Sequence, residues 1–164
     1  MPLSRDKCPV GAGIGEISAS CRVGSDKMTV IAWDGKTLAA DRLAMNGYIR
    51  AEATKIFKLS VYDSLVGLSG NYDSCMAVLD WLEGGRKPTA WPAAAQSSEG
   101  WTRAIEIRRD GTVIYYERHP FPLGFLPAAF HAIGAGGECA LGAMAMGATA
   151  QQAVEVACKF ITGC

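Results

Sequence analysis

The dipeptide Asp34-Gly35 most constrains the fold, because it lies between two apolar runs, residues 29–33 and 37–41. An Asp-Gly pair flanked in this way is a strong signal for a β-hairpin. The same pair recurs as Asp110-Gly111, between expected strands at 101–108 and 112–117. Strands joined by tight turns are antiparallel. The sequence therefore predicts antiparallel sheets built largely from hairpins.

The remaining segments alternate between strand and helix patterns. Short apolar or alternating runs predict three more strands, over 54–60, 65–70 and 128–133. Apolar residues at helical spacing predict three helices, over 71–83, 138–146 and 150–160. Pro and Gly residues predict loops over 84–100 and 118–127. The first loop is expected to contain a short helical turn at 93–96.

This order of elements predicts an α+β fold. Strand pairs come in sets and helices follow each set, so two antiparallel sheets covered by helices fit, in a four-layer α/β/β/α arrangement. The last helix is expected to turn Ala153, Val154, Ala157 and Phe160 inward.

Composition excludes several classes of function. The 164 residues suit one domain, and 16 basic residues balance 16 acidic ones without a basic block. We therefore expect no nucleic-acid partner and no binding to an anionic membrane. No signal peptide and no membrane-spanning run is visible, so we expect a cytoplasmic protein.

The six cysteines and two histidines do not form a metal-binding pattern. No Cys-x-x-Cys pair occurs, and the histidines have no ligand spacing with the cysteines. Cys75, Cys139 and Cys158 lie in stretches with helical apolar spacing, where cysteine acts as a small hydrophobic residue. We expect neither a metal nor another cofactor.

Three residues are candidates for nucleophilic chemistry: Thr29, Asp41 and Lys55. A threonine hydroxyl needs a base, and its own α-amine can serve if the threonine is the first residue. Such an amine has a pKa of roughly 7.7–8.0, which a lysine cation nearby would lower. An aspartate would in turn hold the lysine. Judged by spacing alone, ordinary structural roles explain these residues better.

The length of the first hairpin loop decides whether Asp41 can reach Thr29. A two-residue loop pairs Thr29 with Ala40 and places Asp41 on the opposite face of the sheet. A three-residue loop, with Gly35 left-handed, pairs Thr29 with Ala39 and places Asp41 on the face of Thr29. The sequence leaves both alternatives open.

Four segments taken together resemble the proteasome β-subunit family: residues 29–42, 54–59, 66–70 and the glycine turn 132–137. Within that family the chain resembles the bacterial ATPase-linked proteasome-like peptidase and short phage-type homologues, over residues 29–164. The resemblance implies the four-layer N-terminal-nucleophile hydrolase fold and a threonine-type endopeptidase that cleaves peptide bonds in peptides or proteins. It also implies a homo-oligomeric ring and an ATPase unfoldase as partner.

Carried over residue by residue, the resemblance also implies roles. Thr29 would be the nucleophile and, through its amine, the base. Lys55 would tune that amine, Asp41 would hold Lys55, and the backbone N–H of Gly70 would stabilise the oxyanion.

The chain departs from the family in three places. Ala135 stands where the family usually has a serine, the usual late aspartate is missing near residues 160–164, and the expected closing strand is missing. Residues 1–28 are expected to be a flexible extension, either a pro-segment or an over-extended start, ahead of a C-terminally short hydrolase domain at 29–164. Met28 favours the over-extended start, because an aminopeptidase would remove it and expose Thr29. The alternatives are a catalytically silent shell or interaction protein of the same fold, or a non-peptide amidase.

Overall fold

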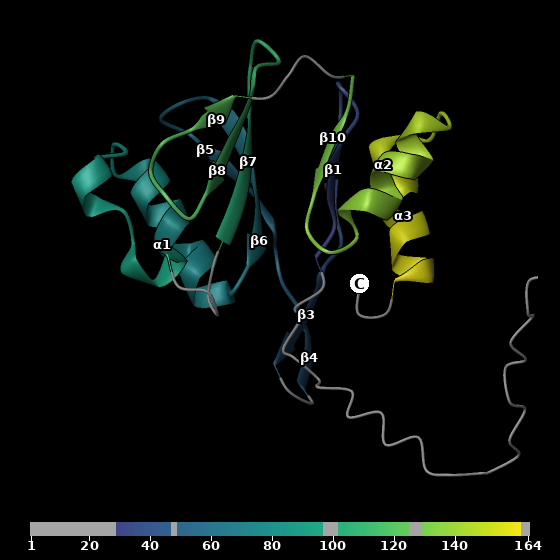
Figure 1. Ribbon diagram of the computed structural model, residues 1–164, viewed down its shortest axis with the longest axis horizontal. Helices are drawn as coiled ribbons and strands as arrows, with labels where there is room; N and C mark the ends of the chain where they lie inside the picture. The colour runs from purple at the N-terminus through teal and green to yellow at the C-terminus, as the bar shows by residue number, and fades with distance from the viewer. Residues whose placement is uncertain (1–28, 47–48, 97–101, 125–128, 162–164) are drawn as a thin grey trace, which may run out of the picture.

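The computed structural model describes residues 29–46, 49–96, 102–124 and 129–161 (Figure 1). The expectations for residues 1–28 and 162–164 lie outside this part of the chain. The strands are β1 (Ile31–Trp33), β2 (Leu38–Ala40), β3 (Leu43–Asn46), β4 (Ile49–Glu52), β5 (Ile56–Leu59), β6 (Ser64–Gly70), β7 (Thr102–Arg108), β8 (Val113–Glu117), β9 (Leu123–Gly124) and β10 (His131–Ile133). The helices are α1 (Tyr72–Glu83), α2 (Gly137–Ala145) and α3 (Ala150–Phe160), with short 3₁₀ turns at Pro88–Ala90 and Ala93–Gln96.

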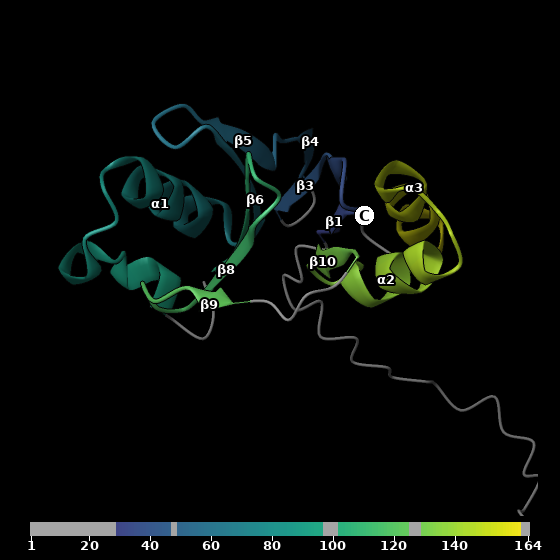
Figure 2. The same ribbon diagram turned by 90° about the horizontal axis from the view of Figure 1, so that it is seen from above.

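The elements form four layers, as Figure 2 shows. Helix α1 covers one sheet, with strand order β5-β6-β7-β8-β9, and helices α2 and α3 cover the other, with order β10-β1-β2. Strands β3 and β4 form a separate two-stranded hairpin below the sheets in Figure 1. Every strand pair in the described part of the chain is antiparallel. The predicted α+β fold and its antiparallel sheets are confirmed.

Isoleucine side chains and one tryptophan fill the space between the two sheets. The buried residues here are Ile31, Trp33, Ile105, Ile107 and Ile133. Gly67 in β6 makes the close approach possible, since a Cβ at this position would lie only 2.7 Å from Ile31 Cγ2. The interface holds β1 firmly in the centre of the molecule, and β1 begins two residues after Thr29.

The loop between β1 and β2 differs from both expected alternatives. Trp33 pairs with Leu38, so four residues, 34–37, make the loop, and neither the two-residue nor the three-residue version is right. The Asp34 carboxylate explains the extra length, because its Oδ1 accepts the N–H groups of Lys36 at 3.0 Å and Thr37 at 2.8 Å. A side chain that closes the loop in this way replaces the tight backbone turn that Asp-Gly usually makes.

Two further expectations need correction. The sequence patterns did not predict the β3–β4 hairpin or the short strand β9, because neither has a clear apolar alternation. Phe160 does not face inward, since 77% of it is exposed. It is the last helical residue of α3 and lies at the edge of the apolar stripe that buries Ala150, Ala153, Val154 and Ala157.

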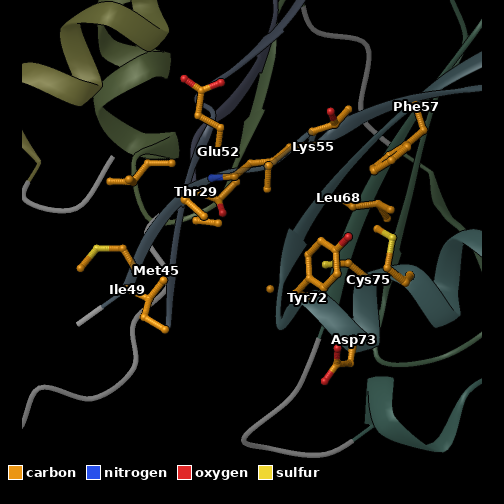
Figure 3. Close-up of a pocket in the computed structure, with 17 residues that line it drawn as sticks. Thr29, Met45, Ile49, Glu52, Lys55, Phe57, Leu68, Tyr72, Asp73 and Cys75 are labelled. Carbon is orange, nitrogen blue, oxygen red and sulfur yellow. The ribbon is translucent and has the colours of Figure 1, made fainter. Parts of the chain in front are cut away.

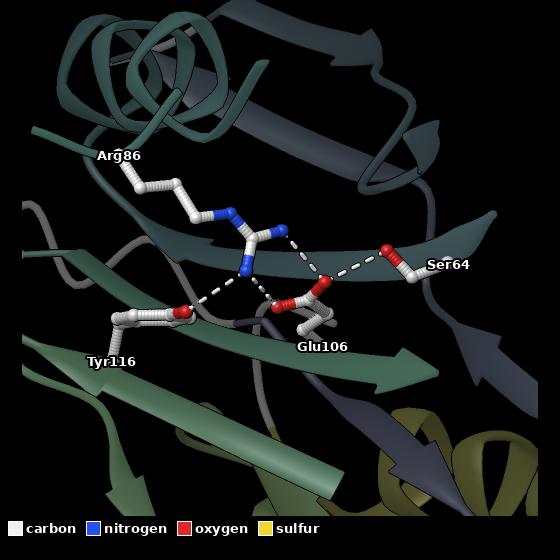
Figure 4. Close-up of polar contacts among 4 residues, drawn as sticks. All are labelled: Ser64, Arg86, Glu106 and Tyr116. Carbon is white, nitrogen blue, oxygen red and sulfur yellow. Dashed lines mark hydrogen bonds and ion pairs between the residues drawn. The ribbon is translucent and has the colours of Figure 1, made fainter. Parts of the chain in front are cut away.

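The layer between α1 and its sheet contains a buried ionic cluster (Figure 4). Arg86, just after α1, donates to both carboxylate oxygens of Glu106, at 2.7 and 2.9 Å. Glu106 is fully buried, and Ser64 donates to it at 2.8 Å. Arg86 also donates to the Tyr116 hydroxyl at 3.2 Å and stacks on the ring of Tyr62. The cluster ties the end of α1 to β6, β7 and β8.

Candidate functional site

A pocket of about 640 Å³ opens between the β3–β4 hairpin and the start of α1. Figure 3 shows Met45 and Ile49 of the hairpin on one side and Leu68, Tyr72 and Cys75 on the other. Thr29, Lys55 and Gly70 all line this pocket. Three of the four candidate site residues predicted from the sequence are therefore brought to one cavity.

The backbone of Thr29 is held by the glycine turn between β10 and α2. The Thr29 carbonyl accepts the N–H of Gly136 at 3.2 Å, and Thr29 is only 4% exposed. Gly134 has φ +91°, and a Cβ there would lie 2.0 Å from the Thr29 carbonyl oxygen. Only glycine fits so close to another backbone in this conformation. The turn therefore fixes Thr29 at the rim of the pocket.

Asp41 is the fourth candidate, and it reaches the site through Lys55. Its Oδ2 lies 2.6 Å from Lys55 Nζ, and both side chains are largely buried, at 3% and 10% exposure. The same carboxylate accepts the backbone N–H of Val30 at 2.9 Å and that of Leu43 at 3.1 Å. Three donors therefore fix the carboxylate, and a fixed carboxylate fixes the lysine.

The four-residue loop sets the level of Asp41 along β1. The register places Ile31 opposite Ala40, and the next backbone contact runs from the Asp41 N–H to the Val30 carbonyl at 3.1 Å. Asp41 is thus level with the residue after Thr29. Its side chain turns back to the start of β1, and Figure 3 shows the Lys55 amine directed at Thr29.

Gly70 ends β6 directly before helix α1. Its φ of +138° is strained for any residue with a side chain, so the glycine is required by the backbone. The next residue, Asn71, caps α1 by accepting the N–H of Asp73 at 3.0 Å. The strand ends and the helix begins here, as the sequence predicted, and Gly70 also lines the pocket.

The sequence reasoning missed the hairpin side of the pocket. Met45, Ile49 and Glu52 line the pocket from β3 and β4. The only available signal was the run of apolar residues from Leu43 to Met45, which is too short to distinguish strand from loop. Ala135 is exposed in the glycine turn, and an alanine there supplies no hydroxyl group to the site.

Among the described residues, no group of His, Cys, Asp or Glu side chains is arranged to hold a metal ion. No described helix is both long and apolar enough to cross a bilayer. What the pocket does contain is a hydroxyl, a lysine paired with a carboxylate, and a glycine backbone.

Comparison with solved structures identifies the fold. No protein-family model matches the chain, and no curated protein matches its sequence. Eukaryotic HslV from Trypanosoma brucei superimposes with a TM-score of 0.55 at 16% identity, over 80% of this chain and 88% of that chain. BPH from Thiobacillus denitrificans, solved in complex with epoxomicin, superimposes with a TM-score of 0.54 at 19% identity, over 81% of this chain and 90% of that chain. A second BPH structure gives 0.51 at 18% identity, again over 81% and 90%.

The chain has an HslV-type N-terminal-nucleophile hydrolase fold. At this level the resemblance noted from the sequence is confirmed.

Proposed function

We propose that this protein is a threonine-type N-terminal-nucleophile hydrolase that cleaves peptide bonds, with Thr29 as its nucleophile. The observation that carries the proposal is the buried Asp41–Lys55 ion pair, 2.6 Å long, whose lysine lines the same pocket as Thr29 and Gly70. A lysine held in this way is a fixed positive charge at the pocket. The solved structures of similar fold support the same class of protein.

The proposed reaction requires that the bond before Thr29 be cut, so that its α-amine is free. The amine then takes the proton of the Thr29 hydroxyl, and the hydroxyl oxygen attacks the substrate carbonyl. The cation of Lys55 lowers the pKa of the amine by like-charge repulsion and keeps it neutral enough to act as a base. The amine returns the proton to the leaving nitrogen, and water then hydrolyses the acyl-enzyme ester.

Gly70 and the apolar walls have separate tasks in this reaction. The Gly70 N–H donates to the oxyanion that forms as the carbonyl is attacked. The glycine has no side chain, so a substrate backbone can approach it closely. The side chain before the cleaved bond then enters the pocket.

We further propose that the active form is a homo-oligomeric ring, supplied with unfolded protein by an ATPase. HslV and BPH, with similar folds, support an assembled peptidase. Sedimentation of the purified protein tests the ring. Association with an ATPase is tested by co-purification from the native host.

Intact mass and active-site labelling test the nucleophile. We expect the mature chain to begin at Thr29 and to react once with a peptide epoxyketone, whose two electrophilic carbons suit a hydroxyl and an amine on one residue. Thr29→Ala should abolish both labelling and peptide cleavage. Thr54→Ala is the matched control, because Thr54 also lines the pocket but has no proposed role. Cleavage that survives in Thr29→Ala would overturn the mechanism.

The role of Lys55 has its own test. Lys55→Met should lower kcat about 10²–10⁴-fold, the range expected when acid–base catalysis is lost. The pH at which the remaining activity rises should be higher than in the wild type, because the pKa of the Thr29 amine is no longer lowered by Lys55. Lys58→Met is the control, since Lys58 is exposed and does not line the pocket. An unchanged pH profile in Lys55→Met would assign Lys55 a purely structural role.

A further inference from the structure

The pocket has two ends that carry different residues. Thr29 and Lys55 are at one end, and Asp73, in the first turn of α1, is at the other (Figure 3). A substrate side chain that follows the length of the pocket from Thr29 would end beside Asp73. The volume of about 640 Å³ leaves room for a long side chain.

The walls between these two ends are mainly apolar. Ile49 and Tyr72 are 66% and 54% exposed, and both line the pocket. Leu68 and Met76 line it from β6 and α1. Such walls suit the methylene stem of a side chain, which loses contact with water when it enters.

The charges of the pocket are unevenly distributed. Lys55 is the cation of the lining, and it already has a counter-charge in Asp41 at 2.6 Å. Glu52 is paired with Arg42 at 3.1 Å. Asp73 has no ion pair with any other residue that the structure describes, so its carboxylate is available at the far end of the pocket.

We propose that this pocket selects a lysine or arginine side chain immediately before the cleaved bond, with Asp73 as its counter-charge. The stem packs on Ile49 and Tyr72 while the cation lies at Asp73. Glutamate at the same substrate position is rejected, because its charge is repelled by Asp73. This inference rests on the proposed peptidase function and adds its substrate class.

Cleavage of capped tripeptide amides that differ only in the last residue tests the preference. We expect kcat/KM to decrease in the order arginine, norleucine, glutamate, where norleucine supplies the stem without the charge. Asp73→Asn should reduce the arginine-to-norleucine ratio about two- to fivefold, the effect of one exposed ion pair. Asp80→Asn, an exposed aspartate of the same helix outside the pocket, should leave the ratio unchanged. A wild-type preference for norleucine, or a ratio unaltered in Asp73→Asn, would overturn the inference.

Binding separates this inference from the proposed function. Surface plasmon resonance with immobilised Thr29→Ala protein measures the affinity of the same three peptides without cleavage. If arginine binds best and Asp73→Asn removes the advantage, while the wild type cleaves nothing, the pocket assignment holds and the peptidase proposal fails. If the three peptides bind Thr29→Ala equally, the pocket assignment fails whatever the activity.

Discussion

At the scale of single residues, the site depends on glycines as much as on reactive groups. Gly134 lies against the backbone of Thr29, and Gly70 ends the strand beside the pocket at φ +138°. Neither residue has a reactive side chain. Their lack of a side chain is what lets the backbone segments around Thr29 come together.

Replacing Gly134 should therefore disturb both stability and the site. Gly134→Ala would place a Cβ 2.0 Å from a backbone oxygen at φ +91°, so a backbone segment must shift. We expect a loss of about 2–4 kcal/mol in the free energy of unfolding, from strain and overpacking together. Urea denaturation measures the loss, and labelling of Thr29 reports on the site.

Gly111→Ala separates the two causes. Gly111 has a similar φ of +83°, but a Cβ there would meet no atom within 4 Å. This control should cost only about 1 kcal/mol, the strain of the backbone alone. If the two variants lose equal stability, the close approach to Thr29 is not what matters at Gly134.

At the scale of elements, the two Asp-Gly turns have different structures despite the same sequence signal. Asp110 accepts within its own turn, from the Thr112 N–H at 2.8 Å and from the Thr112 side chain. Asp34 accepts the N–H groups of its own loop and also that of Ala150 at 2.8 Å, across 116 residues of sequence. Asp34 therefore joins the β1–β2 loop to the start of α3.

Asp34→Ala should consequently be more harmful than Asp110→Ala. We expect Asp34→Ala to cost about 1–2 kcal/mol, because it removes a helix-capping acceptor as well as a loop acceptor. Burial raises the pKa of Asp34, but the hydrogen bonds from Ala150, Thr37 and Lys36 outweigh it and lower the pKa overall. Thermal unfolding at pH 7, where the carboxylate is ionised, measures the difference. Equal losses in the two variants would show that the contact with Ala150 contributes nothing.

The ionic cluster behind α1 gives a second prediction at this scale. Glu106→Gln leaves Arg86 charged, with only 14% of its side chain exposed. Removing one partner of a buried pair typically costs about 3–5 kcal/mol, and we expect a loss in this range on urea denaturation. Glu117→Gln is the control. The Arg103–Glu117 ion pair is similarly short, at 2.8 Å, but its two side chains are about one-third exposed.

The control should lose less than about 1 kcal/mol, because solvent screens exposed pairs. The double variant Arg86→Met/Glu106→Gln should recover part of the loss, since no uncompensated charge remains. A small effect of Glu106→Gln alone would mean that water reaches Arg86.

At the scale of the whole molecule, the central sheet sandwich makes stability depend on pH. His131 in β10 pairs with Trp33 of β1 and is 8% exposed. Burial lowers its pKa below the usual value of 6.5. Below pH 6.5 the unfolded chain therefore binds a proton that the folded chain does not. Stability is lost as the pH falls from about 7 through the folded pKa.

His131→Gln should flatten this dependence. We expect the fall in the free energy of unfolding between pH 7.5 and pH 5.5 to be smaller in His131→Gln than in the wild type. Urea denaturation at several pH values measures it. His119→Gln leaves His131 in place and should retain the wild-type dependence. The same slope in His131→Gln as in the wild type would contradict the assignment.

The sequence by itself determined the elements with strong local signals. The Thr149–Gln152 capping box starts α3, Asn71 caps α1, and Gly84 ends that helix, because these contacts lie within a few residues of one another. Antiparallel pairing followed from the hairpins for the same reason. The sequence also indicated Thr29, Asp41, Lys55 and Gly70 as candidate site residues.

Only the tertiary structure decided how those residues meet. The loop length at 34–37 depends on a carboxylate that also contacts Ala150, which no local pattern records. The Asp41–Lys55 pair, the β3–β4 wall of the pocket and the contact of Gly134 with Thr29 likewise join segments distant in sequence. Such contacts form where the layers pack against one another. Their energies depend on the distances between segments far apart in sequence, and only the complete fold sets those distances.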